Sequence, residues 1–198
     1  MGTFFRALLR PVYAVHLMLV PERYNEKIFC IGFNKTGTTS CGRALRMLGY
    51  RHSSFSRTVK DWYKKNEIVK ILRYTAKFES FDDVPWLHEK MIPILDTAFP
   101  GSKFIYLTRE EAAWKKSVYN WTFKMTGRYP DAEEKLRQFR AHKAFVLNYF
   151  QDRPSSDFLI LDVSGENAFQ QLADFLGKKA GQSAFPHLNK TGQVRSGS

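Results

Sequence analysis

The stretch that decides the fold covers residues 27–50 and reads KIFCIGFNKTGTTSCGRALRMLGY. Its first part is an apolar run that ends in Gly32, which is typical of a buried parallel strand. Its last part, from Thr38 to Leu48, has apolar residues at helical spacing and ends at Gly49. The loop between them is rich in glycine and hydroxyl side chains, so the stretch predicts a strand, an anion-binding loop and a helix.

The loop differs from a nucleoside-triphosphate loop in the position of its lysine. That motif reads G-x-x-x-x-G-K-[ST], with the lysine directly after the second glycine. Gly32 and Gly37 keep the spacing here, but Lys35 stands two residues before Gly37. Backbone N–H groups and the helix N-terminus still form an anion site, to which Lys35 adds a point charge. Hydroxyl donors for the same site are expected from Thr38, Thr39 and Ser40.

The composition is that of one folded, strongly basic domain. The 198 residues are 43% hydrophobic and 15% aromatic, which argues against a disordered chain. The 31 Lys and Arg residues against 19 Asp and Glu give a formal net charge of +12, which favours a polyanionic partner. No RNA-recognition or zinc-finger signature is present, so we expect no nucleic acid. Cys30 and Cys41 fit no disulfide framework or metal motif, so we expect packing roles and a reducing, cytoplasmic location.

The first twenty residues, MGTFFRALLRPVYAVHLMLV, place apolar side chains on a helical stripe. The longer apolar stretch is broken by Arg6, Arg10, Pro11 and His16. The uninterrupted apolar run is too short to span a bilayer. We therefore favour a helix on the domain's own core over a membrane contact through this helix. The expected organisation is an N-terminal helical extension at 1–26, one domain at 27–190 and a loose tail at 191–198.

Strands and helices alternate along the rest of the chain. Thr108 and Glu111 have the spacing of a capping box, which predicts a helix from there towards Met125. The alternation indicates parallel strands joined by right-handed crossovers. We predict a three-layer α/β domain of P-loop type, with a parallel sheet of four or five strands and helices on both faces. Strands are expected at 27–32, 78–83, 103–108 and 157–162, and further helices at 38–48, 58–74, 86–98, 132–150 and 168–176.

A second candidate site lies in SKFIYLTREEAAWKKSVYNW, residues 102–121. Arg109 stands at the carboxyl end of a predicted strand, and Ser117 follows eight residues later in the second turn of the next helix. A guanidinium fork from a strand end and a hydroxyl from a helix face can hold one phosphate group. The pair therefore predicts a second phosphate-binding position.

Together these two motifs resemble a known family. The run from Gly32 to Ser40 is similar to the 5′-phosphosulfate loop of sulfotransferases that use 3′-phosphoadenosine 5′-phosphosulfate (PAPS). Arg109 and Ser117 resemble the 3′-phosphate motif of the same family. The likeness is nearest to a compact single-domain subgroup. Other matching stretches are FDDVPW at 81–86 and FPHLNK at 185–190.

The resemblance implies PAPS as the donor, 3′-phosphoadenosine 5′-phosphate (PAP) as the product, no metal, and a strand order near 2-3-1-4. It places Lys35 on the bridging oxygen of the donor, where it stabilises the charge on the departing phosphate. The sequence departs from the family at Cys41, where an apolar residue such as leucine is usual, and at Glu110-Glu111, where Asp-Pro is more usual. Neither departure touches this chemistry. The donor-binding residues implied are Asn34, Lys35, Thr36, Gly37, Thr38, Thr39, Ser40, Arg109 and Ser117.

Sulfuryl transfer to a hydroxyl or amine needs a base for the acceptor's proton. Asp83, at the end of a short strand, is expected at the carboxyl edge of the sheet, with its neighbour Asp82 pointing away. His88, expected on the first turn of the next helix, is the second candidate. A small-molecule or glycan acceptor is expected to bind between residues 51–77 and 119–152. Aromatic side chains that could line this pocket are Trp62, Tyr63, Tyr119, Trp121, Phe123 and Tyr129.

Two other functions remain open from the sequence. A magnesium-dependent nucleotide kinase is suggested by FLILD at 158–162, an apolar strand that ends in an aspartate like a metal-binding strand. The missing Gly-Lys-Ser/Thr counts against a kinase, and strands often end in Asp for turn reasons. The other alternative is a non-catalytic module that binds anions or a membrane surface.

Overall fold

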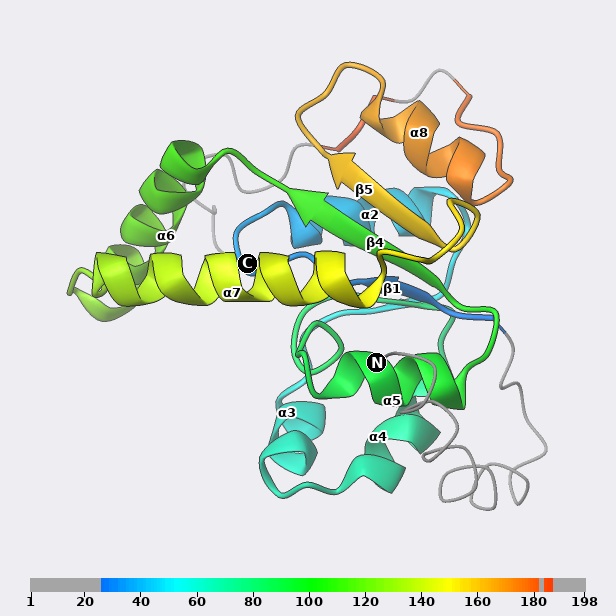
Figure 1. The fold of residues 1–198 in the computed structure, drawn as a ribbon, viewed down its shortest axis with the longest axis horizontal. Coiled ribbons are helices and arrows are strands. Elements are labelled where there is room, and N and C mark those ends of the chain that lie inside the picture. The colour runs from blue at the N-terminus through cyan, green and yellow to red at the C-terminus, as the bar shows by residue number, and fades with distance from the viewer. Residues whose placement is uncertain (1–25, 182–183, 187–198) are drawn as a thin grey trace, which may run out of the picture.

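In the computed structural model of the protein, the described residues are 26–181 and 184–186 (Figure 1). The predictions for the N-terminal helix, for the end of the FPHLNK stretch and for the tail lie outside these residues. Within the described part of the chain, no helix is long and apolar enough to cross a membrane.

The centre of the fold is a parallel five-stranded sheet in the order β2-β3-β1-β4-β5. Four of the strands correspond to the predicted runs, but numbered among themselves they lie in the order 2-1-3-4 and not 2-3-1-4. The implied order 2-3-1-4 describes the sheet only when the unpredicted strand β2 is counted. The added strand, β2, is only two residues long, so no alternating run marks it in the sequence. The strands are β1 (Ile28–Cys30), β2 (His52–Ser53), β3 (Ser80–Phe81), β4 (Lys103–Thr108) and β5 (Phe158–Asp162).

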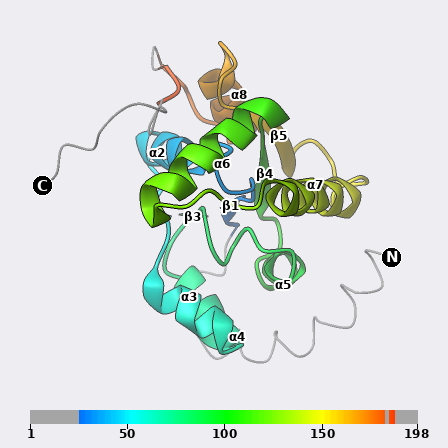
Figure 2. The ribbon, with the colours of Figure 1, turned by 90° about the vertical axis from the view of Figure 1, so that its left-hand side faces the viewer.

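Helices cover both faces of this sheet, which confirms the three-layer α/β prediction (Figures 1 and 2). The helices α2 and α8 pack on one face, and α3, α4, α5 and the end of α7 pack on the other. The helix α6 extends beyond the carboxyl end of β4 and lies against α7. The helices are α2 (Thr38–Met47), α3 (Arg57–Lys64), α4 (Ile68–Thr75), α5 (Met91–Ala98), α6 (Glu111–Thr126), α7 (Ala132–Tyr149) and α8 (Ala168–Phe175).

The strand β1 is apolar along its whole length because both of its faces are covered. Ile28 and Cys30 join the cluster under α2 and α8, while Phe29 joins the cluster under α5 and α7. The Phe29 ring stacks on Phe81 of β3 and on Phe104 of β4, each at 5.3 Å between ring centroids. The central strand is thus held by packing on both sides as well as by its ladder of hydrogen bonds.

Both cysteines are free and buried in the cluster under α2 and α8. A side-chain hydrogen bond with Cys41 and burial together raise the pKa of the Cys30 thiol well above its usual value. Cys30 is therefore a neutral packing side chain, as the sequence predicted.

Three predicted boundaries are wrong. The helix expected at 58–74 is two helices, because Asn66 takes a left-handed conformation (φ 57°) between α3 and α4. The helix expected from residue 86 starts only at Met91, since residues 85–90 form turns. Thr108 does not cap α6, because it still pairs with β5. The cap is Glu110, whose carboxylate accepts hydrogen bonds from the N–H groups of Ala112 (2.7 Å) and Ala113 (2.8 Å).

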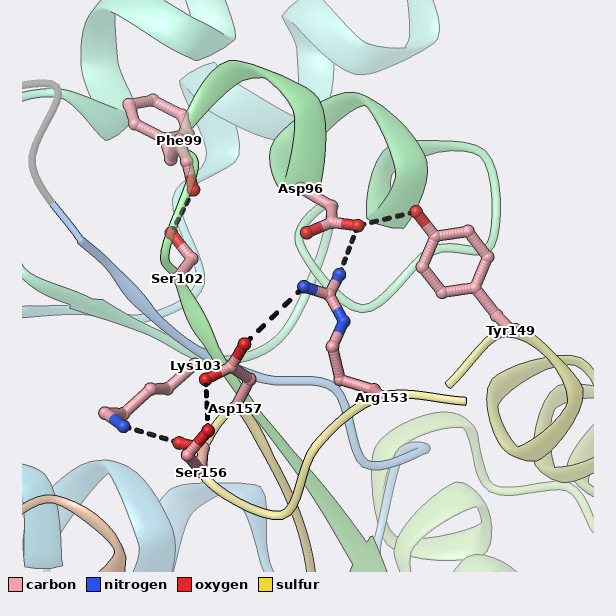
Figure 3. A network of polar contacts seen from close by, with 8 residues as sticks. All are labelled: Asp96, Phe99, Ser102, Lys103, Tyr149, Arg153, Ser156 and Asp157. Carbon is pink, nitrogen blue, oxygen red and sulfur yellow. Dashed lines mark hydrogen bonds and ion pairs between the residues drawn. The ribbon is translucent and has the colours of Figure 1, made fainter. Parts of the chain in front are cut away.

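A polar network joins α5 to the connection between α7 and β5 (Figure 3). Asp96 of α5 is 7% exposed and accepts hydrogen bonds from the Tyr149 hydroxyl at 2.8 Å and from Arg153 at 2.5 Å. The other terminal nitrogen of Arg153 lies 3.8 Å from a carboxylate oxygen of Asp157. The network adds polar contacts between elements that also share the apolar cluster under α5 and α7.

We predict that Asp96→Ala lowers the free energy of unfolding by about 3 kcal/mol, because it leaves the Arg153 guanidinium shielded from water without its closest carboxylate. Urea unfolding of the purified protein measures this change. Lys70→Ala is the matched control, since it removes an exposed ion pair with Glu67 on α4 and should cost less than about 1 kcal/mol. Equal effects of the two substitutions would contradict a structural role for the network.

Candidate active site

The predicted anion-binding loop connects β1 to α2 at the carboxyl edge of the sheet. Gly32 lies so close to β4 that a Cβ atom there would come within 2.6 Å of the Leu107 Cβ. Gly37 has a φ of +105°, and a Cβ there would meet the Val163 side chain at 2.6 Å. Both positions therefore require glycine, the first for space and the second also for its backbone conformation.

Three side chains from distant parts of the chain bind carbonyl oxygens of this loop region. Each bond is 2.8 Å long, and the partners are 74 to 111 residues apart in the sequence. The bonds run from Arg109 to the Lys35 oxygen, from the Trp114 indole to the Asn34 oxygen, and from His142 Nε2 to the Ile31 oxygen. Since a carbonyl can only accept, His142 carries its proton on Nε2 here.

A small apolar cluster supports these bonds. Phe33 of the loop packs against Trp114 of α6 and Phe139 of α7, with ring centroids 6.2 and 6.1 Å away. Trp114 and Phe139 stack on each other at 4.3 Å. The cluster is separate from the two cores of the sheet. The loop is therefore fastened to the α6–α7 pair as well as to the strands.

The hydroxyl residues of the loop have different roles. Thr36 is buried and donates both its hydroxyl (2.7 Å) and its N–H (3.2 Å) to the Phe33 oxygen, so it shapes the loop from within. Thr38 and Thr39 begin α2 and are half-buried and exposed, whereas Ser40 is buried. The N-cap residue of α2 is Gly37, which has no side chain. The helices α4, α5 and α8 also lack a side-chain cap bond, whereas α3, α6 and α7 have one. An anion could therefore approach the N-terminus of α2 without displacing a cap.

Lys35 is held in an unusual backbone conformation for a non-glycine residue, with a φ of 70°. Its Nζ lies 5.1 Å from the centre of the Trp121 ring on α6, in a cation–π contact. The Trp121 side chain is 50% exposed. Trp121, one of the predicted pocket aromatics, thus contacts Lys35. Trp62 and Tyr63 instead pack against the core cluster under α5.

Arg109 and Ser117 lie where the second motif predicted them. Arg109 directly follows β4, and Ser117 is 9% exposed on the inner stripe of α6 with Trp114 and Val118. Arg109 donates through one terminal nitrogen to the loop. A guanidinium has five N–H donors, so the same side chain can serve the loop and an anion together.

The two neighbouring aspartates are separated as predicted. Asp82 is 2% exposed, with one oxygen 3.3 Å from His52 Nε2. Asp83 is half-buried, has a φ of 67° and accepts the Val84 N–H at 2.7 Å. Burial raises the pKa of Asp83 and the nearby Asp82 adds to the rise, while the Val84 bond and the charges of Lys60 and Lys35 oppose it. Asp83 is thus within electrostatic reach of Lys35 and is more basic than an ordinary aspartate.

His88 lies in the turns before α5 rather than on the helix itself. Its ring stacks on Tyr63, with centroids 4.8 Å apart and planes at 4°. Burial lowers the pKa of His88, and the charge of a protonated His142 would lower it further. The ring is therefore neutral near pH 7 and remains chemically able to accept a proton.

Trp114 and His142 were not predicted as site residues from the sequence. A signal for Trp114 was available, because it shares a helical face with Ser117 and Trp121 at i, i+3 and i+7. His142 stands on the apolar stripe of α7 with Phe139 and Val146 and is 2% exposed. A histidine in such a stripe indicates a buried hydrogen bond, but the sequence cannot say that the partner is the loop.

The chain belongs to a family of sulfotransferases, because a family model described as "Sulfotransferase domain" matches residues 27–132, more than half of its length. The matched range contains the loop, both aspartates, Arg109 and Ser117. The resemblance of the two motifs to sulfotransferases is thus confirmed at the level of the family. The protein is an enzyme of the class that transfers sulfuryl groups.

The other comparisons add no function. A gluconokinase from Sinorhizobium meliloti 1021 has a similar structure, with a TM-score of 0.48, 12% sequence identity, and coverage of 79% of this chain and 94% of that one. At this level of similarity the kinase's activity does not transfer to the present chain. No curated protein matches the sequence.

Proposed function

We propose that the protein transfers the sulfuryl group of PAPS to a hydroxyl or amine of a small-molecule or glycan acceptor, without a metal ion. The observation that carries this proposal is the uncapped N-terminus of α2 behind a loop that holds Lys35 at the carboxyl edge of the sheet. A loop of backbone donors with one lysine suits a phosphosulfate, which has no γ-phosphate to bridge.

The donor would lie across two anion positions. Its 5′-phosphosulfate would bind the loop from Asn34 to Ser40, with Thr36 contributing through loop shape. Its 3′-phosphate would bind Arg109 and Ser117, which flank the first turns of α6. The partial burial of both side chains favours this reading, because shielding from water strengthens a charge-assisted hydrogen bond.

In the proposed reaction the acceptor oxygen or nitrogen forms a bond to sulfur while the bond from sulfur to the bridging oxygen breaks. The electron pair of that bond leaves with the 5′-phosphate of PAP, and Lys35 stabilises the charge that develops there. Asp83 takes the proton of the acceptor, for which its raised pKa is suited. His88 is the alternative base.

The alternative of a magnesium-dependent kinase relied on Asp162 at the end of β5. One carboxylate oxygen of Asp162 accepts the Ser164 N–H at 2.9 Å and the Ser164 hydroxyl at 2.6 Å. This is the pattern of a side chain that closes a turn. The observation supports the turn explanation over a metal-binding one, so we do not favour the kinase.

Calorimetric titration with PAP, ATP and ATP with magnesium tests the donor. We expect PAP to bind tightly and independently of metal. Binding of magnesium-ATP alone would identify a kinase, and binding of none of the three would favour a non-catalytic module.

In the same kind of titration, Arg109→Ala should lower the affinity for PAP by about tenfold to a hundredfold. It should lower the affinity for adenosine 5′-phosphosulfate much less, since only PAP carries the 3′-phosphate.

Ser117→Ala should act in the same direction but more weakly, because a neutral hydroxyl supplies one donor. This variant also controls for damage to the loop. Arg109 donates a hydrogen bond to the Lys35 carbonyl oxygen, whereas Ser117 has no such bond to the loop among the described residues. Equal losses for both ligands in Arg109→Ala would mean that Arg109 only supports the loop.

We predict that Lys35→Ala lowers turnover by roughly 100- to 1000-fold while part of the PAP affinity remains. The physical reason is that its charge would act mainly on the oxygen that becomes negative in the transition state. Steady-state kinetics with labelled PAPS and calorimetry with PAP give the two quantities. Lys60→Ala is the matched control for a nearby lysine outside the loop. Near-normal turnover in Lys35→Ala would show a surface charge only.

The base is tested by the pH dependence of turnover. Asp83 accepts a proton only when ionised, so the rate should rise with pH through the pKa of Asp83, at higher pH than an ordinary aspartate because that pKa is raised. Asp83→Asn should lower the rate by about 100- to 10,000-fold and abolish this acid limb. If the limb survives in Asp83→Asn and disappears in His88→Gln, the base is His88.

A further inference from the structure

The far end of α6 and the turn that follows carry an unusual group of exposed apolar side chains. Phe123, Met125 and Tyr129 are 46%, 64% and 64% exposed. Of the seven large hydrophobic side chains that are exposed in the described part of the chain, these three and Trp121 lie within nine consecutive residues. We call Phe123, Lys124, Met125, Arg128 and Tyr129 the arm tip.

The arm tip has a defined shape. The Phe123 ring stacks on Tyr129 at 4.7 Å, and Tyr119 lies 5.6 Å from Tyr129. The Thr126 hydroxyl donates to the Thr122 oxygen at 2.8 Å and accepts the Arg128 N–H at 3.2 Å. The apolar side chains are therefore presented on a closed turn, where little conformational entropy is lost on binding.

Within the segment that carries these side chains, all charges are positive. Residues 112–130 contain four cations and no carboxylate. Lys115 lies 4.0 Å from Glu133, but Lys116, Lys124 and Arg128 have no ion pair among the described residues. The acidic residues that follow are engaged at the start of α7, where Asp131 caps the helix and Glu134 pairs with Arg137. The exposed apolar side chains are thus interleaved with cations, two of which, Lys124 and Arg128, belong to the arm tip itself.

The position of the arm tip is open to a large partner. The turn between α6 and α7 lies at one end of the long axis of the molecule, away from the sheet (Figure 1). From the side, α6 crosses in front of the carboxyl edge of the strands (Figure 2). A flat surface could therefore touch the arm tip without meeting the helices that cover the sheet.

We propose that the arm tip docks the protein on an anionic membrane surface. Phenylalanine and methionine gain free energy by entering the boundary of the acyl chains, tyrosine suits the headgroup level, and the cations are attracted by acidic lipids. A second copy of the chain is a poorer partner, because a symmetric contact would place the same cations opposite each other. A soluble acidic polymer would satisfy the cations but leave Phe123 and Met125 in water.

Docking would also orient the proposed reaction centre. Trp121 is half a helical turn before Phe123 and one turn before Met125, and its ring lies under the Lys35 amine. The arm tip would therefore hold the loop near the membrane, and acceptors at the membrane surface would be favoured. This last step rests on the proposed function, whereas the docking itself does not.

The test is sedimentation of the full chain with vesicles of phosphatidylcholine alone and of phosphatidylcholine with phosphatidylserine. We expect binding that depends on phosphatidylserine and weakens with salt. The double variant K124Q/R128Q should bind about thirtyfold more weakly, since each cation near an anionic leaflet contributes about fivefold. The triple variant F123S/M125S/Y129S should lose at least roughly tenfold, because its apolar side chains no longer leave water.

Matched variants separate the arm tip from general surface effects. F55S/I160S removes exposed apolar side chains elsewhere, and K64Q/K65Q removes exposed cations at the end of α3. Both should bind vesicles within about twofold of the wild type, because neither pair lies at the arm tip. Urea unfolding midpoints should be equal for all four variants, which shows that each is folded.

Three outcomes would overturn the proposal. The first is wild-type protein that does not bind phosphatidylserine vesicles. The second is arm-tip variants that bind as well as the wild type, which would assign the contact to another segment. The third is arm-tip variants that keep vesicle binding but lose binding to another partner. Reduced self-association in light scattering would identify a second copy of the chain, and reduced retention on immobilised heparin would identify an acidic polymer.

Discussion

The bond from the Arg109 guanidinium to the Lys35 carbonyl oxygen joins the two motifs of the site, and the shape of the loop depends on it and its two companions. A loop with a glycine at each end has few conformational restraints of its own. Its backbone groups must nevertheless be hydrogen-bonded where they are shielded from water. Trp114 of α6 and His142 of α7 donate two of these hydrogen bonds, to the carbonyl oxygens of Asn34 and Ile31. The conformation of the loop therefore depends on side chains from the end of β4, from α6 and from α7, and not on the loop sequence alone.

The parallel sheet explains why the chemistry gathers at one edge. Strands that run in the same direction place the residues after their carboxyl ends side by side. Lys35 follows β1, Asp83 follows β3 and Arg109 follows β4, and these three strands are neighbours in the sheet. Burial raises the pKa of Asp83, while the Val84 hydrogen bond and the charges of Lys60 and Lys35 oppose the rise. The topology thus brings together the three residues that we propose as cation, base and anion clamp.

The parts of this arrangement that could be predicted are those with local causes. The apolar run, the glycines and the helical spacing lie within 24 consecutive residues, 27–50, and Arg109 and Ser117 are eight residues apart. The features that were not predicted depend on partners far apart in the sequence or on very short elements. The sequence around His142 cannot name the Ile31 carbonyl 111 residues away as its acceptor, and a two-residue strand such as β2 has no period to detect. The misplaced cap at Thr108 shows a third cause, since sheet pairing with β5 overrode a local capping pattern.

The small cluster of Phe33, Trp114 and Phe139 has a consequence for how the fold opens. Because it is separate from the two cores of the sheet, α6 and the first half of α7 can detach together while the strands stay packed. Such a partial opening would break the Trp114 bond to the loop, so the loop would be released in the same event. Slow amide exchange in the strands and faster, concerted exchange in α6 would be the signature of this hierarchy. The loop would then keep its folded conformation only as long as α6 and the first half of α7 stay packed, and not as long as the sheet does.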